Sequence, residues 1–124
     1  MNIAVWVVQV LLAVAYLAAG VLKTTQSREA LKAKGLAWVE DFSDGTVKLI
    51  GAVEALGAIG LVLPAATGIL PWLTPLAAVG LAVVQLLAIP VHLRRGEKQA
   101  LPVNVVLLLL AVFVAWQRFG PNAF

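Results

Sequence analysis

The sequence predicts an all-α protein, an antiparallel bundle of four transmembrane helices. Of its 124 residues, 62% are hydrophobic and only 12% are charged, whereas about a quarter of the residues in a soluble domain are charged. The apolar residues fall into four runs, each near the roughly 20 residues that a helix needs to cross a bilayer. Four such runs leave no room for a soluble domain, so we expect a single membrane domain over residues 1–124.

The composition also excludes several kinds of site. There is no cysteine, which excludes disulfides, thiol redox chemistry and thiolate metal sites. The single histidine, His92, excludes a multi-histidine metal site within one chain, and we expect no metal. The net charge is +3, but in a chain this apolar we interpret the basic residues as facing anionic lipid headgroups. We therefore expect the lipid bilayer, and no nucleic acid, as a partner.

The first helix is predicted over residues 2–22. The run has no basic segment before it and exceeds the 7–15 apolar residues of a secretory signal, so we interpret it as a retained transmembrane helix. Lys23 closes this run.

A polar connection follows over residues 27–45. Ser27 predicts the N-cap of a short helix, Arg28–Lys34, and Gly35 predicts its end. Two interpretations are open for this segment: an amphipathic stretch on the membrane surface, or an ordinary loop with a few anchoring aromatic residues. Its apolar side chains are Leu36, Trp38, Val39 and Phe42.

Proline and charge mark the remaining boundaries. Pro64 and Pro71 bound a short uncharged turn that is typical of a tight helical hairpin. Pro90 is expected to bend the end of the third helix. A charged turn then leads into the last helix. The three remaining helices are predicted over residues 47–63, 72–92 and 101–117.

The basic residues predict the topology. Eight of the nine fall on one side of the four predicted helices, and only Arg118 falls on the other. Because basic residues concentrate in cytoplasmic loops, we expect a multi-pass protein of the inner (plasma) membrane with both termini outside the cytoplasm. Trp6, Trp72 and Trp116 lie near the predicted outer helix ends, as interfacial tryptophans do.

All four helices place a polar residue in the half nearest the basic loops. Glu54 is predicted about 10 Å below the surface at 1.5 Å per residue, where a charge is costly and is a functional candidate by default. One hypothesis is a small polar cavity open toward the cytoplasm. The other is a structural network in which Glu54 pairs with Lys23 or His92. The candidate intramembrane polar cluster is Lys23, Glu54, Gln85, His92 and Asn104.

Several short motifs resemble those of the DoxX-like family of small four-helix membrane proteins. The resemblance covers essentially the whole chain. It is carried by Ala19-Gly-Val-Leu-Lys23, Lys48-Leu-Ile-Gly-Ala-Val-Glu54-Ala-Leu-Gly57, Pro75-Leu-Ala-Ala78, Pro90-Val-His92-Leu-Arg94 and Pro102-Val-Asn104. The family takes its name from a subunit associated with a thiosulfate:quinone oxidoreductase. Other bacterial members are linked to redox-stress complexes, and a similar eukaryotic branch assists receptor assembly.

This resemblance implies a membrane subunit, or a quinone-site or lipid-site partner, of a redox complex. The chain has no cofactor motif of its own, so we expect no intrinsic cofactor, a quinone or lipid as the ligand, and no enzyme activity by the chain alone. The alternative is a non-catalytic assembly factor or structural partner for other membrane proteins. A small-solute transporter is disfavoured, because the chain shows neither an inverted repeat nor a pair of interrupted helices. A homo-oligomer is an open alternative.

Overall fold

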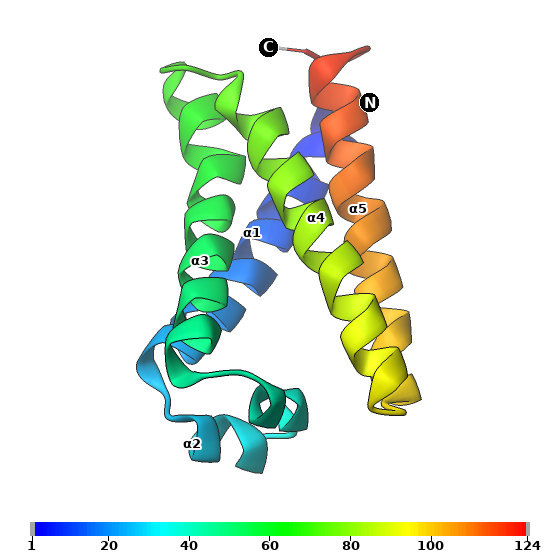
Figure 1. Ribbon diagram of the computed structural model, residues 1–124. Helices are drawn as coiled ribbons and strands as arrows, with labels where there is room; N and C mark the ends of the chain where they lie inside the picture. Colours follow the sequence, from blue (N-terminus) through cyan, green and yellow to red (C-terminus); the bar gives the residue numbers. More distant parts are fainter. Residues whose placement is uncertain (1, 124) are drawn as a thin grey trace.

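The computed structural model describes residues 2–123, and every regular element in this part of the chain is a helix. Four of the helices are long and apolar enough to cross a membrane. They are α1 (Asn2–Thr25), α3 (Asp44–Thr67), α4 (Leu73–Arg94) and α5 (Leu101–Phe119). Successive long helices run in opposite directions, and both chain ends lie at the same end of the bundle (Figure 1). The predicted antiparallel four-helix bundle is therefore confirmed.

The four helices form a closed ring around a small core. α1 packs along α3, α3 along α4 and α4 along α5, and a smaller contact between α5 and α1 closes the ring. Large apolar side chains also cover the outside: Leu56 is 69% exposed and Leu87 is 68% exposed. Lipid tails are as apolar as these side chains, so this surface suits a multi-pass membrane protein. The core contains Leu12, Tyr16, Ala58, Leu61, Ala78, Leu81, Ala111 and Val114.

Glycine allows α1 and α3 to approach each other closely. A Cβ atom added at Gly20 of α1 would lie 2.5 Å from the carbonyl oxygen of Gly51 on α3. One added at Gly51 would lie 2.7 Å from Cβ of Lys23. Small residues allow helix backbones to meet in this way in membranes. The contact draws the end of α1 against α3, next to Glu54.

α3 does not end where the proline pattern predicts. The predicted turn from Pro64 to Pro71 is wrong at its start, because the helix continues through Pro64 to Thr67 and ends at Gly68, whose φ is +72°. Pro64 has no N–H to donate to the carbonyl of Gly60. The buried Thr74 hydroxyl donates to that carbonyl instead, at 3.2 Å. A neighbouring helix therefore satisfies the group that the proline leaves unpaired.

The connection after α1 folds into two short helices, α2 (Arg28–Ala33) and η1 (Ala37–Asp41). As predicted, Ser27 caps α2, and its hydroxyl accepts the N–H of Ala30 at 3.1 Å. Leu31 and Val39 are buried together with Val47 of α3. We refer to residues 26–43 as the α2–η1 segment. Its other large apolar side chains, Leu36, Trp38 and Phe42, pack against this buried cluster.

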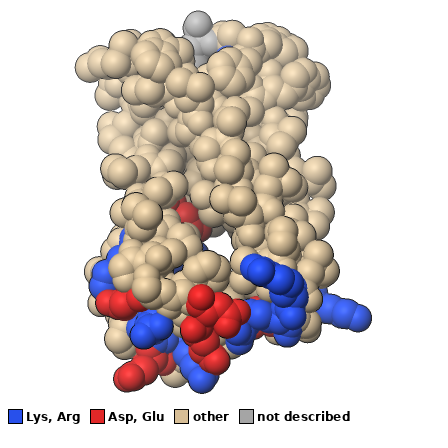
Figure 2. Space-filling view, in the orientation of Figure 1, with Lys and Arg blue, Asp and Glu red and all other residues tan. Residues whose placement is uncertain are grey.

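Charged side chains gather at the end of the molecule that carries the α2–η1 segment (Figure 2). The turn between α4 and α5, which includes η2 (Lys98–Ala100), lies at the same end. The opposite end carries Arg118, which is buried. The charged end and the terminal end of the bundle are therefore chemically distinct.

Candidate functional site

A cavity of about 670 Å³ lies at the charged end, between the four long helices and the α2–η1 segment. Ligand pockets commonly have volumes of about 300–1,000 Å³ and combine apolar walls with a few polar groups. Figure 2 shows the molecule hollowed just above its charged end. All five residues of the predicted polar cluster line this cavity: Lys23, Glu54, Gln85, His92 and Asn104.

Lys23 and Glu54 form an ion pair across the α1–α3 contact. The Nζ atom of Lys23 lies 2.5 Å from Oε1 of Glu54, and the side chains are 12% and 4% exposed. The ammonium group also lies 5.3 Å from the ring centroid of Trp38 in η1. Lysines near helix ends usually extend to the membrane surface. Here the close approach of α1 and α3 turns the side chain inward, so the buried acid has a partner.

Gln85 of α4 and Asn104 of α5 form the second pair. The Nδ2 atom of Asn104 donates to Oε1 of Gln85 at 2.7 Å, and both residues are more than nine-tenths buried. Oδ1 of Asn104 has no hydrogen-bond partner in the part of the chain that the structure describes. Buried polar atoms are normally paired. Because Asn104 lines the cavity, its unpaired oxygen marks the deep end as a place for a polar partner.

His92 does not pair with Glu54. Its Nδ1 atom lies 2.9 Å from Oε1 of Glu97, which follows α4 in the turn to α5. The hypothesis that His92 is the partner of Glu54 is therefore wrong, because the histidine turns toward the helix end. The pair lies where α4 ends, beside the exposed Arg94, and we refer to this end of the cavity as its mouth.

The α2–η1 segment forms one wall of the cavity at its charged end. Arg95 of the α4–α5 turn joins it through Asp41, with Nη1 and Oδ2 2.9 Å apart, and Arg95 also contacts Glu97 at 3.3 Å. These two carboxylates raise the pKa of Arg95. On the segment itself, Lys32 lies 2.8 Å from Glu40 and lowers the pKa of that carboxyl group. Ion pairs thus hold one wall of the cavity in place.

Sequence reasoning missed four residues of this site that bear on its chemistry or its shape. Leu36, Trp38 and Phe42 line the cavity, although their pattern had left open only a segment on the membrane surface or an ordinary loop. Nothing local in the sequence shows that the segment folds back under the bundle. Glu97 was also missed, although its place five residues after His92, just beyond a helix end, could have suggested the pairing.

A second buried polar cluster ties the terminal end together. Arg118 of α5 donates through Nε to Oε1 of Gln9 at 2.6 Å and through Nη1 to Oδ1 of Asn2 at 2.7 Å. Gln9 in turn donates to the carbonyl of Leu61 on α3 at 2.7 Å. The guanidinium also lies over the ring of Trp6. We interpret this cluster as a structural link between α1, α3 and α5.

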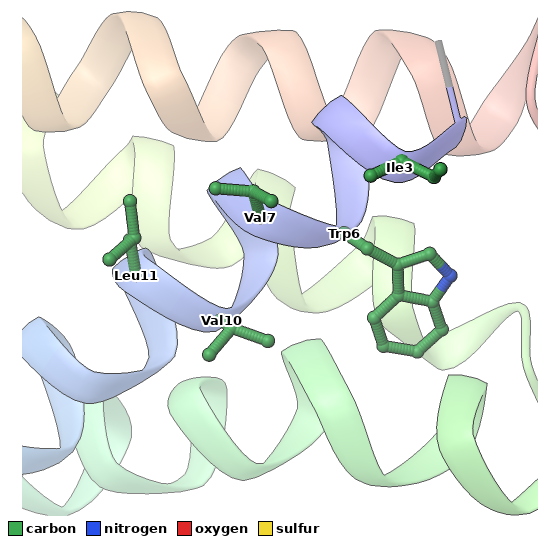
Figure 3. Close-up of a pocket in the computed structure, with 5 residues that line it drawn as sticks. All are labelled: Ile3, Trp6, Val7, Val10 and Leu11. Atoms are coloured by element: carbon green, nitrogen blue, oxygen red, sulfur yellow. The ribbon is translucent and has the colours of Figure 1, made fainter.

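A shallow apolar depression on α1 offers no comparable site. Figure 3 shows the side chains that line it along the outward side of the helix. Apart from the indole nitrogen of Trp6, the side chains that line it are apolar, so the depression suits acyl chains of the bilayer. Its lining residues are Ile3, Trp6, Val7, Val10 and Leu11.

Comparison with known families finds a match to the DoxX-like family over residues 7–114. The chain belongs to the DoxX-like family. The matched span contains the predicted polar cluster and the α2–η1 segment of this DoxX-like protein, and it stops before Arg118. No curated protein and no solved structure matches the chain in the corresponding comparisons.

Proposed function

We propose that this DoxX-like protein is a membrane subunit that binds the head of a quinone or lipid at its charged end and serves a redox complex. The observation that carries the proposal is the cavity of about 670 Å³, in which an apolar wall meets three polar pairs. Amphiphilic membrane molecules need both surfaces, an apolar one for the chain and a polar one for the head.

The residues present fit a quinone head. Its two carbonyl oxygens accept hydrogen bonds, and the cavity offers donors in the ammonium of Lys23, the amides of Gln85 and Asn104, and the imidazole of His92. When bound, a quinone would carry electrons and protons between the redox complex and the quinone pool of the membrane. The chain's own side chains would hold and orient the head, while Leu107 and other apolar residues would pack on it.

The same arrangement offers a place for proton exchange. His92 and Glu97 lie at the mouth, partly exposed, and can exchange protons with water. Glu54 lies deeper and is held by Lys23. A ligand between these two pairs would have an acid–base group on either side.

We further propose that the charged end faces the cytoplasm of a plasma membrane. Eight of the nine basic residues are at or near this end of the helices in the sequence, and basic residues concentrate on the cytoplasmic side. The cavity would then open toward the cytoplasmic leaflet, with both termini on the opposite side.

Native mass spectrometry of the protein, gently extracted from its own membrane, tests the binding proposal. We expect a quinone or lipid in about equimolar amount, identified by extraction of the same sample. The double variant Gln85→Leu/Asn104→Leu should lose most of this ligand. Leu109→Ala is the matched control, because Leu109 is 61% exposed on the outside of α5, and it should retain the ligand.

An empty wild-type protein would overturn the proposal. If a second polypeptide accompanies that empty protein, the assembly-factor or structural-partner role is favoured instead. Such a partner would have to use the outer faces of the bundle, because α1 already covers Gly51 and Ala55 of α3.

A further inference from the structure

The deep part of the cavity is electrically balanced. Lys23 contributes a positive charge and Glu54 a negative one, and their charged atoms lie 2.5 Å apart. Gln85 and Asn104, which face them from α4 and α5, are neutral. The other charged lining residues are at the mouth, where Glu97 is partly exposed and Arg94 is exposed to solvent.

We propose that Glu54 is a specificity-determining residue, which neutralises Lys23 so that the cavity accepts uncharged polar heads and rejects anionic ones. The inference rests on the proposed function, since it concerns the ligand of the same cavity. It names the class of ligand as an amphiphile with a neutral carbonyl-bearing or hydroxyl-bearing head. A head with a net negative charge, such as that of phosphatidylglycerol, would be excluded.

The physical argument begins with Lys23. A lysine ammonium is a compact charge that readily binds phosphate. Here one side of the ammonium contacts Glu54, and the ring of Trp38 lies on it as well. A phosphate entering the cavity would therefore have to displace the carboxylate from Lys23.

The carboxylate itself adds a second barrier. Its side chain is only 4% exposed, and buried charges are screened by salt much less than exposed ones. An anion placed beside it meets a repulsion that typically costs several kcal/mol at an interface. A neutral head meets no such barrier and can still accept a hydrogen bond from a donor in the wall.

Glu54→Gln tests this inference directly. The variant keeps the shape of the side chain and removes the negative charge. The protein would be reconstituted in nanodiscs that contain equal amounts of phosphatidylglycerol and phosphatidylcholine. After its release from the nanodiscs, native mass spectrometry would count the lipid that stays bound to it. A parallel titration would use decylubiquinone as the neutral probe.

Wild type should bind decylubiquinone and show no preference for phosphatidylglycerol. Glu54→Gln should favour phosphatidylglycerol by about tenfold or more, since a tenfold ratio is only about 1.4 kcal/mol.

Two further variants complete the charge series. Lys23→Met/Glu54→Gln carries neither charge, so it should lose the gain in phosphatidylglycerol while it still binds decylubiquinone. Lys23→Gln leaves the carboxylate of Glu54 without its positive partner. This variant should therefore bind the cationic amphiphile dodecyltrimethylammonium about tenfold better than wild type. This last variant keeps the test decisive if Glu54→Gln does not fold.

The outcomes separate the inference from the proposed function. Wild type that already prefers phosphatidylglycerol, or charge variants whose lipid preferences match wild type, would overturn the specificity role of Glu54. Failure of every variant to bind decylubiquinone would overturn the quinone site, while the phospholipid ratios would still decide the role of Glu54.

Discussion

Replacing Lys23 with methionine removes the cation that is paired with Glu54 and keeps a long, flexible apolar chain in its place. The carboxylate is then left with 4% of its side chain exposed. Removing one partner of a buried ion pair typically costs 3–5 kcal/mol, because the other charge is left uncompensated. We expect a loss of about 3 kcal/mol in the free energy of unfolding, at the low end of this range, because the Lys23 side is 12% exposed and admits some water.

The double variant Lys23→Met/Glu54→Gln should recover most of that loss. Removing both charges together is often nearly neutral, since neither is left alone. Equilibrium unfolding in mixed micelles, followed by circular dichroism, would measure all three proteins. Lys98→Met is the control for loss of a lysine at the same end, because Lys98 is exposed, and it should match wild type. If Lys23→Met is as stable as wild type, or if the double variant is no more stable than the single one, the ion pair does not act as described.

Three further predictions test other parts of the fold. Gly20→Ala should lower the free energy of unfolding by about 1–3 kcal/mol through overpacking, because its Cβ would lie 2.5 Å from a backbone oxygen of α3. Gly80→Ala, which meets open space, should be unchanged or more stable by up to about 1 kcal/mol, and equal stability of the two variants would refute the close-packing argument. Arg118→Met should cost about 2–3 kcal/mol in the same assay, since it removes hydrogen bonds from a charged donor to α1; a wild-type value would contradict the structural role of this cluster. Lys32 lowers the pKa of Glu40 below its ordinary 4.5, so the stabilisation is complete above pH 4.5 and is lost as the pH falls through the lowered value. Hydrogen exchange in the α2–η1 segment, corrected for intrinsic rates, should therefore rise in acid, and Glu40→Gln should abolish that rise.

Much of the architecture could be predicted from local sequence patterns. Hydropathy alone locates four membrane-length helices, since an apolar run of about 20 residues is typical of a transmembrane helix. The Ser27 cap depends on side chains within one turn of the backbone, which is why it too could be read directly. The five polar residues of the cluster could also be selected, because a polar side chain stands out in an apolar helix.

Their pairing could not be predicted in the same way. Whether Glu54 meets Lys23 or His92 depends on how closely α1 approaches α3, and that distance is set where Gly20 meets Gly51. Likewise, the continuation of α3 through Pro64 depends on a hydrogen bond that the hydroxyl of Thr74, on the next helix, donates to the carbonyl of Gly60.

The α2–η1 segment also shows which features the local sequence determines and which depend on tertiary packing. Its sequence alone determines a capped short helix followed by apolar residues among acids, and this pattern is compatible with a membrane surface, a loop or a protein interior. Only the tertiary structure shows that part of this pattern packs against the bundle. Leu31 and Val39 bury against α3, and Arg95 of the α4–α5 turn holds Asp41. Helices are specified by nearby residues, whereas the cavity arises between elements that are distant in the chain, so only the packed bundle shows it.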